Sequence, residues 1–245
     1  MKLTFLGTSH GVPMTDRFCS SALIEVGDAA YLIDGGAPVA DLLIRRGIPF
    51  SKIRAVFTTH IHSDHTIGLL GFMSLSNWYY KDASYDLYMT EQAGIDAFKN
   101  VILATDKVFN EDRIRMKLVT EGEFYKDANI TVRAFPTLHM NGKFPTWSFV
   151  IDSADGKRVV FTGDMHVRDA VDFPQIAKDE PSDAIVCEMA HFGHDTVLPI
   201  LEKCPTKKML INHIFWHYEE NLAAIAEAGK TMPIHAVADG EEIEL

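Results

Sequence analysis

Short apolar runs bounded by turn-forming residues recur along the chain, and this pattern predicts β-strands. Two dipeptides, Gly27-Asp28 and Asp155-Gly156, predict hairpin turns between neighbouring runs. Longer segments in which apolar residues recur every three or four positions predict helices. The predicted strands cover residues 3–6, 22–26, 31–33, 53–57, 85–89, 130–135, 146–151, 159–162, 184–187, 209–211 and 234–237. The predicted helices cover residues 38–46, 91–104, 195–204 and 219–228, and a further helix starts at residue 66.

The segment 66–119 has the least regular pattern. Its apolar residues Leu69, Phe72 and Met73, together with the Trp78-Tyr79-Tyr80 cluster, predict helical core, although the aromatic cluster could instead form one wall of a pocket. Strands and helices in mixed order favour a layered α/β fold. At 245 residues and 47% apolar content, we expect a single domain over residues 1–245.

Amino-acid composition limits which partners and which cellular compartment we expect for this protein. The formal net charge of −11 disfavours nucleic-acid binding, which needs a matching basic surface. No apolar run is long enough for a membrane span, and the first residues lack a signal-peptide pattern. The three cysteines (Cys19, Cys187 and Cys204) lie far apart and form no C-x-x-C pair, which favours a reducing cytoplasm over a disulfide framework.

The most informative stretch is Thr59-His60-Ile61-His62-Ser63-Asp64-His65, which follows the predicted strand 53–57. It places three imidazoles and one carboxylate within six residues. So many polar groups in so short a turn cannot be satisfied by packing alone. Imidazole nitrogen and carboxylate oxygen are ligands for zinc, manganese and iron. The stretch therefore predicts a metal site.

We expect three later residues to complete this site. Each directly follows an apolar run, and the ends of strands deliver side chains to a shared edge of a sheet. The three residues are His139, Asp164 (after Thr162-Gly163) and His213. We expect His60, His62 and His139 to hold one divalent cation and Asp64, His65 and His213 to hold a second. Asp164 would bridge the two, leaving room for a shared water or hydroxide.

The series His60-Ile61-His62-Ser63-Asp64-His65, His139, Thr162-Gly163-Asp164 and Asn212-His213 resembles the ligand series of the metallo-β-lactamase superfamily. The resemblance implies a four-layer αβ/βα sandwich with two metal ions, Zn²⁺ or alternatively Mn²⁺ or Fe, at one edge. Asp164 at the bridging position, and Asp64 with His65 at the second metal, are similar to the hydrolase branches that cleave phosphodiesters, thioesters or lactones.

Residues 5–13, 183–188 and 238–245 further resemble ribonuclease Z and its phosphodiesterase relatives. Two features depart from that pattern. Only 25 positions separate His139 from Asp164, which leaves no room for the arm that grips tRNA in ribonuclease Z. His166 and His217 stand where those enzymes tend to have arginines. We therefore expect a small anionic substrate rather than tRNA, and relatives of this kind are often homodimers.

The resemblance implies that Glu188 works with a histidine that donates a proton to the leaving group. Two candidates remain: His194, in a Gly-His-Asp-Thr stretch, and His191, three residues after Glu188, which we favour. The expected activity is hydrolysis of a phosphodiester by a hydroxide held between Asp64 and Asp164. A lactonase or thioesterase on the same site, an RNA endonuclease and a metal-binding sensor are the alternatives.

Overall fold

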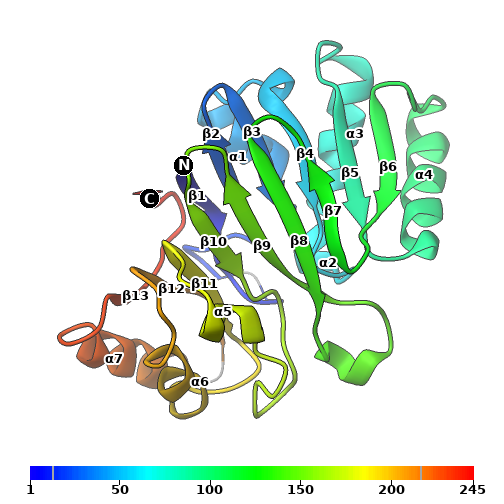
Figure 1. Cartoon of the computed structure of the whole chain (residues 1–245). Helices are drawn as coiled ribbons and strands as arrows, with labels where there is room; N and C mark the ends of the chain where they lie inside the picture. Colours follow the sequence, from blue (N-terminus) through cyan, green and yellow to red (C-terminus); the bar gives the residue numbers. More distant parts are fainter. Residues whose placement is uncertain (13, 216) are drawn as a thin grey trace.

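The computed structural model describes residues 1–12, 14–215 and 217–245, so Pro13, the last residue of the segment 5–13 that resembles ribonuclease Z, lies outside the described residues. Within these ranges two sheets of seven strands pack face to face (Figure 1). The first sheet has the order β14-β1-β2-β3-β4-β5-β6 and the second has the order β13-β12-β11-β10-β9-β8-β7.

The first sheet consists of β1 (Lys2–Gly7), β2 (Ser21–Val26), β3 (Ala29–Ile33), β4 (Ile53–Phe57), β5 (Tyr85–Met89), β6 (Ile114–Leu118) and β14 (Glu242–Glu244). The second consists of β7 (Gly122–Lys126), β8 (Ile130–Pro136), β9 (Trp147–Ser153), β10 (Arg158–Phe161), β11 (Ala184–Met189), β12 (Met209–Ile214) and β13 (Ile234–Ala236). The helices are α1 (Val39–Arg45), η1 (Phe50–Lys52), α2 (Ser63–Thr66), α3 (Gly68–Trp78), α4 (Gln92–Asp106), η2 (His139–Gly142), α5 (Gln175–Asp179), α6 (His194–Leu201) and α7 (Tyr218–Ala228).

Helices cover the outer face of each sheet, which confirms the predicted αβ/βα sandwich. One apolar cluster fills the space between the sheets, and a separate cluster lies under the helices on either side. Strand β3 shows why the apolar runs are continuous: Tyr31 points into the central cluster and Leu32 into the outer one. A strand buried on both faces needs apolar residues at every position. Among the described residues, no helix combines the length and the apolar character needed to cross a membrane.

Strand direction brings the predicted ligands to one edge. Strands β3 to β6 are parallel in the first sheet, and β10 to β13 are parallel in the second. Ligand residues follow β4 in the first sheet and follow or close β8, β10 and β12 in the second. Because the carboxyl ends of parallel strands meet at one edge, each sheet delivers polar side chains to the same end of the sandwich.

Several sequence-based predictions need correction. The helix expected from residue 66 is α3, which begins at Gly68. A separate short helix, α2, precedes it and carries Asp64 and His65. Trp78 and Tyr79 are 49% and 78% exposed rather than core, whereas Tyr80 stacks on Phe50 with 4.3 Å between ring centroids.

Two strands, β6 and β7, were not predicted. Strand β6 alternates apolar and charged residues, and in β7 a charged residue stands on either side of the aromatic pair. Both are outer strands of their sheets, so the continuous apolar run of an inner strand is missing. The helix predicted over residues 195–204 ends at Leu201, and the short elements α5 and β14 were also missed.

Asp127 joins the two sheets near the start of β8. One carboxylate oxygen accepts hydrogen bonds from the Tyr31 hydroxyl (2.6 Å) and the Tyr125 hydroxyl (2.9 Å), and the other accepts the backbone N–H groups of Asn129 (2.7 Å) and Ile130 (2.9 Å). We expect Asp127→Ala to lower the free energy of unfolding by about 2–3 kcal/mol, because both hydroxyls lose a charged acceptor. Urea denaturation measures this, and Asp127→Asn should show a smaller loss.

The same carboxylate makes the free energy of unfolding depend on pH. Burial alone would raise the pKa of Asp127, but the hydrogen bond from Tyr31 and the backbone N–H groups outweigh burial and lower it. A carboxyl whose pKa is lower in the folded state stabilises the fold above its unfolded pKa. This contribution is lost as the pH falls through the folded pKa. The difference in stability between the wild type and Asp127→Ala should therefore shrink in acid.

Candidate metal centre

The structure brings the seven predicted ligands together at the carboxyl edge of the sheets. The donor atoms of these seven residues and of His191 form overlapping groups within 4.8 Å of one another, each of which could hold a metal ion. The groups are His60, His62 and His139; Asp64, His65 and His213; His60, His65 and Asp164; and His139, Asp164 and His191. The first two are the sets expected from the sequence, and each takes residues from both sheets.

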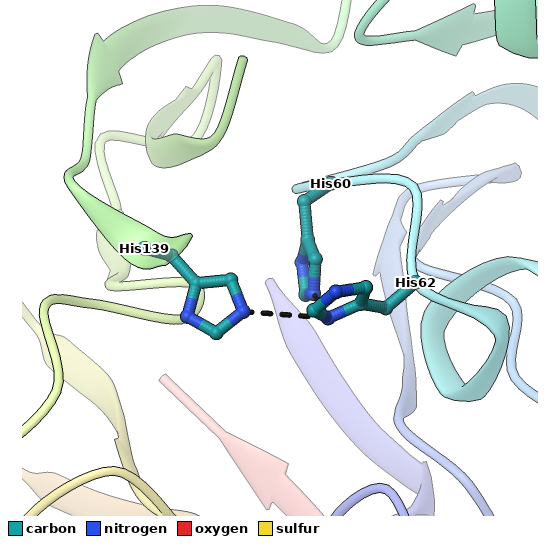
Figure 2. Close-up of side chains that lie close together, drawn as sticks. All are labelled: His60, His62 and His139. Atoms are coloured by element: carbon teal, nitrogen blue, oxygen red, sulfur yellow. Dashed lines mark hydrogen bonds between the residues drawn. The ribbon is translucent and has the colours of Figure 1, made fainter. Parts of the chain in front are cut away.

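In the first group three imidazoles face one another (Figure 2). The Nδ1 atom of His62 lies 3.0 Å from Nε2 of His60 and 3.3 Å from Nε2 of His139. His60 and His139 are buried, and His62 is partly exposed. The partly exposed His62 marks the side from which solvent or substrate reaches this group.

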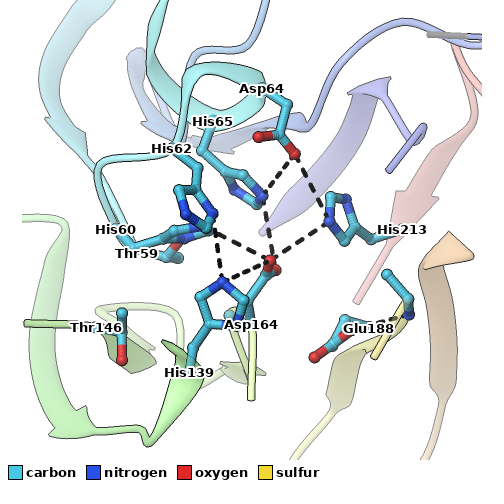
Figure 3. Close-up of polar contacts among 12 residues, drawn as sticks. Thr59, His60, His62, Asp64, His65, His139, Thr146, Asp164, Glu188 and His213 are labelled. Carbon is cyan, nitrogen blue, oxygen red and sulfur yellow. Dashed lines mark hydrogen bonds and ion pairs between the residues drawn. The ribbon is translucent and has the colours of Figure 1, made fainter. Parts of the chain in front are cut away.

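Asp164 lies between the two groups (Figure 3). Its carboxylate oxygens are 3.6 Å from Nε2 of His60, 3.6 Å from Nε2 of His65 and 3.5 Å from Nε2 of His213. In the second group Asp64 lies 3.3 Å from His65 Nε2 and 3.8 Å from His213 Nε2.

The backbone before Asp164 requires glycine. Gly163 has φ +59°, and a Cβ atom there would lie 2.4 Å from the carbonyl oxygen of Trp147. Only glycine takes this conformation and this close approach without strain. The Thr162-Gly163-Asp164 turn can therefore bring the carboxylate into the centre of the cluster.

Two histidines of the second group have their outward nitrogens bound to oxygen acceptors. Nδ1 of His65 lies 2.8 Å from a carboxylate oxygen of Asp34, and Nδ1 of His213 lies 2.9 Å from the carbonyl oxygen of Ser9. These oxygens only accept, so we assign the proton of each neutral ring to Nδ1. The Nε2 lone pair then points into the cluster. Nε2 of His65 is buried without a hydrogen-bond partner among the described residues.

The buried histidines of the first group are arranged in the same way. Nδ1 of His60 lies 3.1 Å from the Thr59 hydroxyl, and Nδ1 of His139 lies 3.4 Å from the carbonyl oxygen of Met165. Inward lone pairs and two carboxylates, with outward ring nitrogens held by oxygen, are the donor set that a divalent cation needs. The residues present fit a pair of such cations.

The charges of the cluster agree with this fit. Burial lowers the pKa of His60, His62 and His139, which keeps these rings neutral. Burial would also lower the pKa of His65, but Asp164 and Asp34 outweigh burial and raise it well above its usual value. The protein without metal therefore holds a proton on His65 that a cation must displace, so metal affinity should decrease as the pH falls.

Sequence reasoning missed Asp34, which supports residues of both groups. It accepts a hydrogen bond from the Thr59 backbone N–H (2.7 Å) and from the Thr59 hydroxyl, in addition to its contact with His65. Through Thr59 it also reaches His60. A signal was present in the sequence, because Asp34-Gly35-Gly36 follows an apolar run just as Asp164 does.

Replacing Asp34 with asparagine should weaken metal binding by roughly 10–100-fold, the usual effect of losing a carboxylate behind a ligand histidine. Asparagine suits the backbone here, because residue 34 has φ 59° and asparagine tolerates the left-handed region. Competition with a chelator measures the change. Asp41→Asn on the exposed face of α1 is the matched control, and equal affinities for the two variants would contradict the prediction.

Of the two candidate proton donors, only His191 lies at the cluster. Its Nδ1 is 2.9 Å from the Glu188 carboxylate and 3.9 Å from Asp164, and its ring centroid is 4.5 Å from that of His139. The Glu188 carboxylate also accepts the backbone N–H of Met165 (2.8 Å), which fixes its position. Burial would lower the pKa of His191, but Glu188 outweighs it and raises the pKa to about 9. The side chain of His191 is 21% exposed.

The remaining histidines belong to none of the ligand groups formed by the described residues. His194 begins α6, where its Nδ1 lies 2.9 Å from the side-chain oxygen of Asn221. His166 contacts Asp169 (2.7 Å) and Asn141 (3.1 Å) instead of the cluster. The side chain of His217 is 73% exposed.

Comparisons with known proteins agree with the architecture. The family model described as anti-Pycsar protein Apyc1 matches residues 1–240. A ribonuclease Z from Acaryochloris marina is 29% identical over 157 residues, which cover 63% of this chain and 48% of that protein. The chain thus spans about half the length of this relative.

Solved structures show the same fold at low sequence identity. The metallo-β-lactamase fold protein YhfI from Bacillus subtilis superposes with a TM-score of 0.78 at 20% identity, covering 99% of either chain. A diphosphatase from the PhnP family superposes with a TM-score of 0.74 at 20% identity, covering 100% of this chain and 97% of its own. At these identities the likeness concerns the fold alone.

Proposed function

Because the chain belongs to the anti-Pycsar protein Apyc1 family, and is a ribonuclease Z-like member of the metallo-β-lactamase superfamily, we propose that it is a metal-dependent phosphodiesterase acting on a small molecule or nucleotide. The observation that carries the proposal is the pair of ligand groups joined by Asp164, with His191 and Glu188 beside them. Two metal ions and a proton donor are the parts that in-line displacement at phosphorus requires.

The proposed cofactors are two divalent cations, with Zn²⁺ as the first choice and Mn²⁺ or Fe as alternatives, because all three accept nitrogen and carboxylate ligands. One would be held by His60, His62 and His139, and the other by Asp64, His65 and His213; Asp164 would be shared. A dinuclear centre of this kind activates water near neutral pH and neutralises charge on a phosphoryl group.

The protein's own groups perform the proton transfers. Asp64 and Asp164 are the carboxylates beside which the attacking water would be oriented. His191 donates its Nε2 proton to the leaving oxygen, since its Nδ1 is held by Glu188. In the protein without metal, Glu188 raises the pKa of His191 to about 9, which favours the protonated form that a general acid needs.

A small substrate fits better than RNA. The net charge of −11 gives no general attraction for a polyanion, although two cations would create local positive charge for one phosphate group. Between His139 and Asp164 the chain forms only η2, β9, β10 and their connections. One structure with the same fold is described as a diphosphatase from the PhnP family, and this supports a phosphate-containing substrate.

A substrate panel tests the proposal. Protein loaded with Zn²⁺ or Mn²⁺ should hydrolyse bis-p-nitrophenyl phosphate and at least one nucleotide phosphodiester, and should leave thioesters, lactones and pre-tRNA unchanged. Turnover of acyl substrates without phosphodiester hydrolysis would instead assign a lactonase or thioesterase. Metal binding without any turnover would favour a sensor.

A further inference from the structure

Two strained loops face each other beside the first ligand group. In the loop that carries His139, Met140 and Asn141 both have φ 55°. In the loop that follows Asp164, Arg168 has φ 88° and Ala170 has φ 44°. Residues other than glycine in the left-handed region cost on the order of 1–3 kcal/mol each and persist only where surrounding contacts hold them. Both loops therefore need a contact that keeps them in place.

Asp172 makes that contact. Its carboxylate accepts the backbone N–H of Leu138 through a short hydrogen bond, and it accepts the backbone N–H of His166 at 2.9 Å and 3.1 Å. Leu138 immediately precedes His139, and His166 lies two positions after Asp164. One carboxylate thus joins the backbone beside a ligand of the first group to the backbone beside the shared ligand. Hydrogen bonds to a charged acceptor are stronger than neutral ones.

The contact of the His139 side chain itself with the second loop is weaker than the hydrogen bonds to the Asp172 carboxylate. Its Nδ1 lies 3.4 Å from the carbonyl oxygen of Met165, which is long for a hydrogen bond. Nε2 of His166 lies 3.1 Å from the side-chain oxygen of Asn141. The orientation of His139 relative to Asp164 therefore depends on how closely the backbones of the two loops are held. Asp172 contributes to this together with the Thr137 hydroxyl, which donates a hydrogen bond to the carbonyl oxygen of Asp164 at 2.9 Å.

We propose that Asp172 is a positioning residue for the first metal site: it sets the separation of the two loops, and so the affinity of the group His60, His62 and His139 for its cation. The inference rests on the metal centre of the proposed function but on no particular substrate. The second group depends on this contact less, because it shares only Asp164 with the two loops. Its own ligand His213 lies within β12, and the Nδ1 of His213 is held by the carbonyl oxygen of Ser9.

The test compares Asp172→Ala with Asp169→Ala. Asp169 is an exposed carboxylate of the same loop, and its contacts, to His166 Nδ1 and to the Val171 N–H, stay within that loop. Metal affinity is measured with Zn²⁺ by chelator competition, and the unfolding of the metal-free proteins is measured by heat. In Asp172→Ala one of the two bound equivalents should become roughly 10–100-fold weaker, as for other groups that orient metal ligands. Asp169→Ala should retain both equivalents at wild-type affinity.

A third variant separates positioning from folding. Asp172→Asn keeps one acceptor oxygen without the charge, so its loss of affinity should lie between those of the wild type and Asp172→Ala. Unchanged affinity in Asp172→Ala, or an equal loss in Asp169→Ala, would overturn the proposal. Equal weakening of both equivalents, together with a lower unfolding temperature of the metal-free protein, would also overturn it by showing a merely structural role. A wild-type protein that binds no Zn²⁺ would refute the proposed function itself, and the proposal with it.

Discussion

Asp164→Ala is expected to remove hydrolysis almost completely, because this carboxylate is the only residue placed between both ligand groups among the described residues. Losing an outer partner of a ligand usually costs roughly 10–100-fold, and losing a shared ligand should cost more than that. The bound metal should fall below two equivalents at the same time. Steady-state kinetics and elemental analysis of the purified variant measure both effects.

Asp112→Ala, in an exposed turn, is a suitable control for the loss of one carboxylate. Circular dichroism should show that Asp164→Ala retains the fold, since the central and outer apolar clusters are untouched. Hydrolysis at the wild-type rate in Asp164→Ala would refute the dinuclear centre. A variant with full metal content but no activity would restrict the role of Asp164 to chemistry.

His191→Ala should reduce kcat by roughly 10²–10⁴-fold, the usual contribution of a general acid. The loss should depend on the leaving group. An alkoxide needs a proton to depart, whereas p-nitrophenolate departs readily without one. Nucleotide phosphodiesters should therefore show the full loss and bis-p-nitrophenyl phosphate a much smaller one. Rates with the two substrates, measured on protein with verified metal content, check this.

His194→Ala is the matched control, because it removes an imidazole that contacts Asn221 rather than the cluster. It should keep near wild-type rates on both substrates. The reverse pattern, with a large loss in His194→Ala and little in His191→Ala, would transfer the proton donor to His194. Equal losses of His191→Ala on both substrates would indicate that His191 does not protonate the leaving group.

The sequence was sufficient to predict which polar side chains cluster, because each of them stands where an apolar run ends. His139, Asp164 and His213 follow or close strands whose burial on both faces makes the runs continuous and easy to find. The order of the ligands along the chain also resembles one superfamily, which gave the fold. The outer strands β6 and β7 were not predicted because charged residues interrupt their apolar positions.

The partners of the supporting carboxylates could not be predicted in the same way, although Asp34 itself follows an apolar run. Asp172 is recognisable only by its partners, Leu138 and His166, and the first of these lies 34 positions away along the chain. Asp34 lies 25 and 31 positions from Thr59 and His65. An isolated aspartate in a loop gives no sign of which backbone N–H groups it will meet, since this depends on how the strands are ordered in each sheet.

Both of the groups expected from the sequence draw on the two halves of the chain. His60 and His62 lie close to His139, and Asp64 and His65 lie close to His213. The cations would therefore act as cross-links between the amino-terminal and carboxy-terminal sheets at the end of the sandwich where solvent enters. Occupancy then contributes to resistance against unfolding as well as to catalysis, because ligands that bind only the folded state stabilise it. Treatment with a chelator should loosen this end first, and neither half alone would retain a complete set of donors.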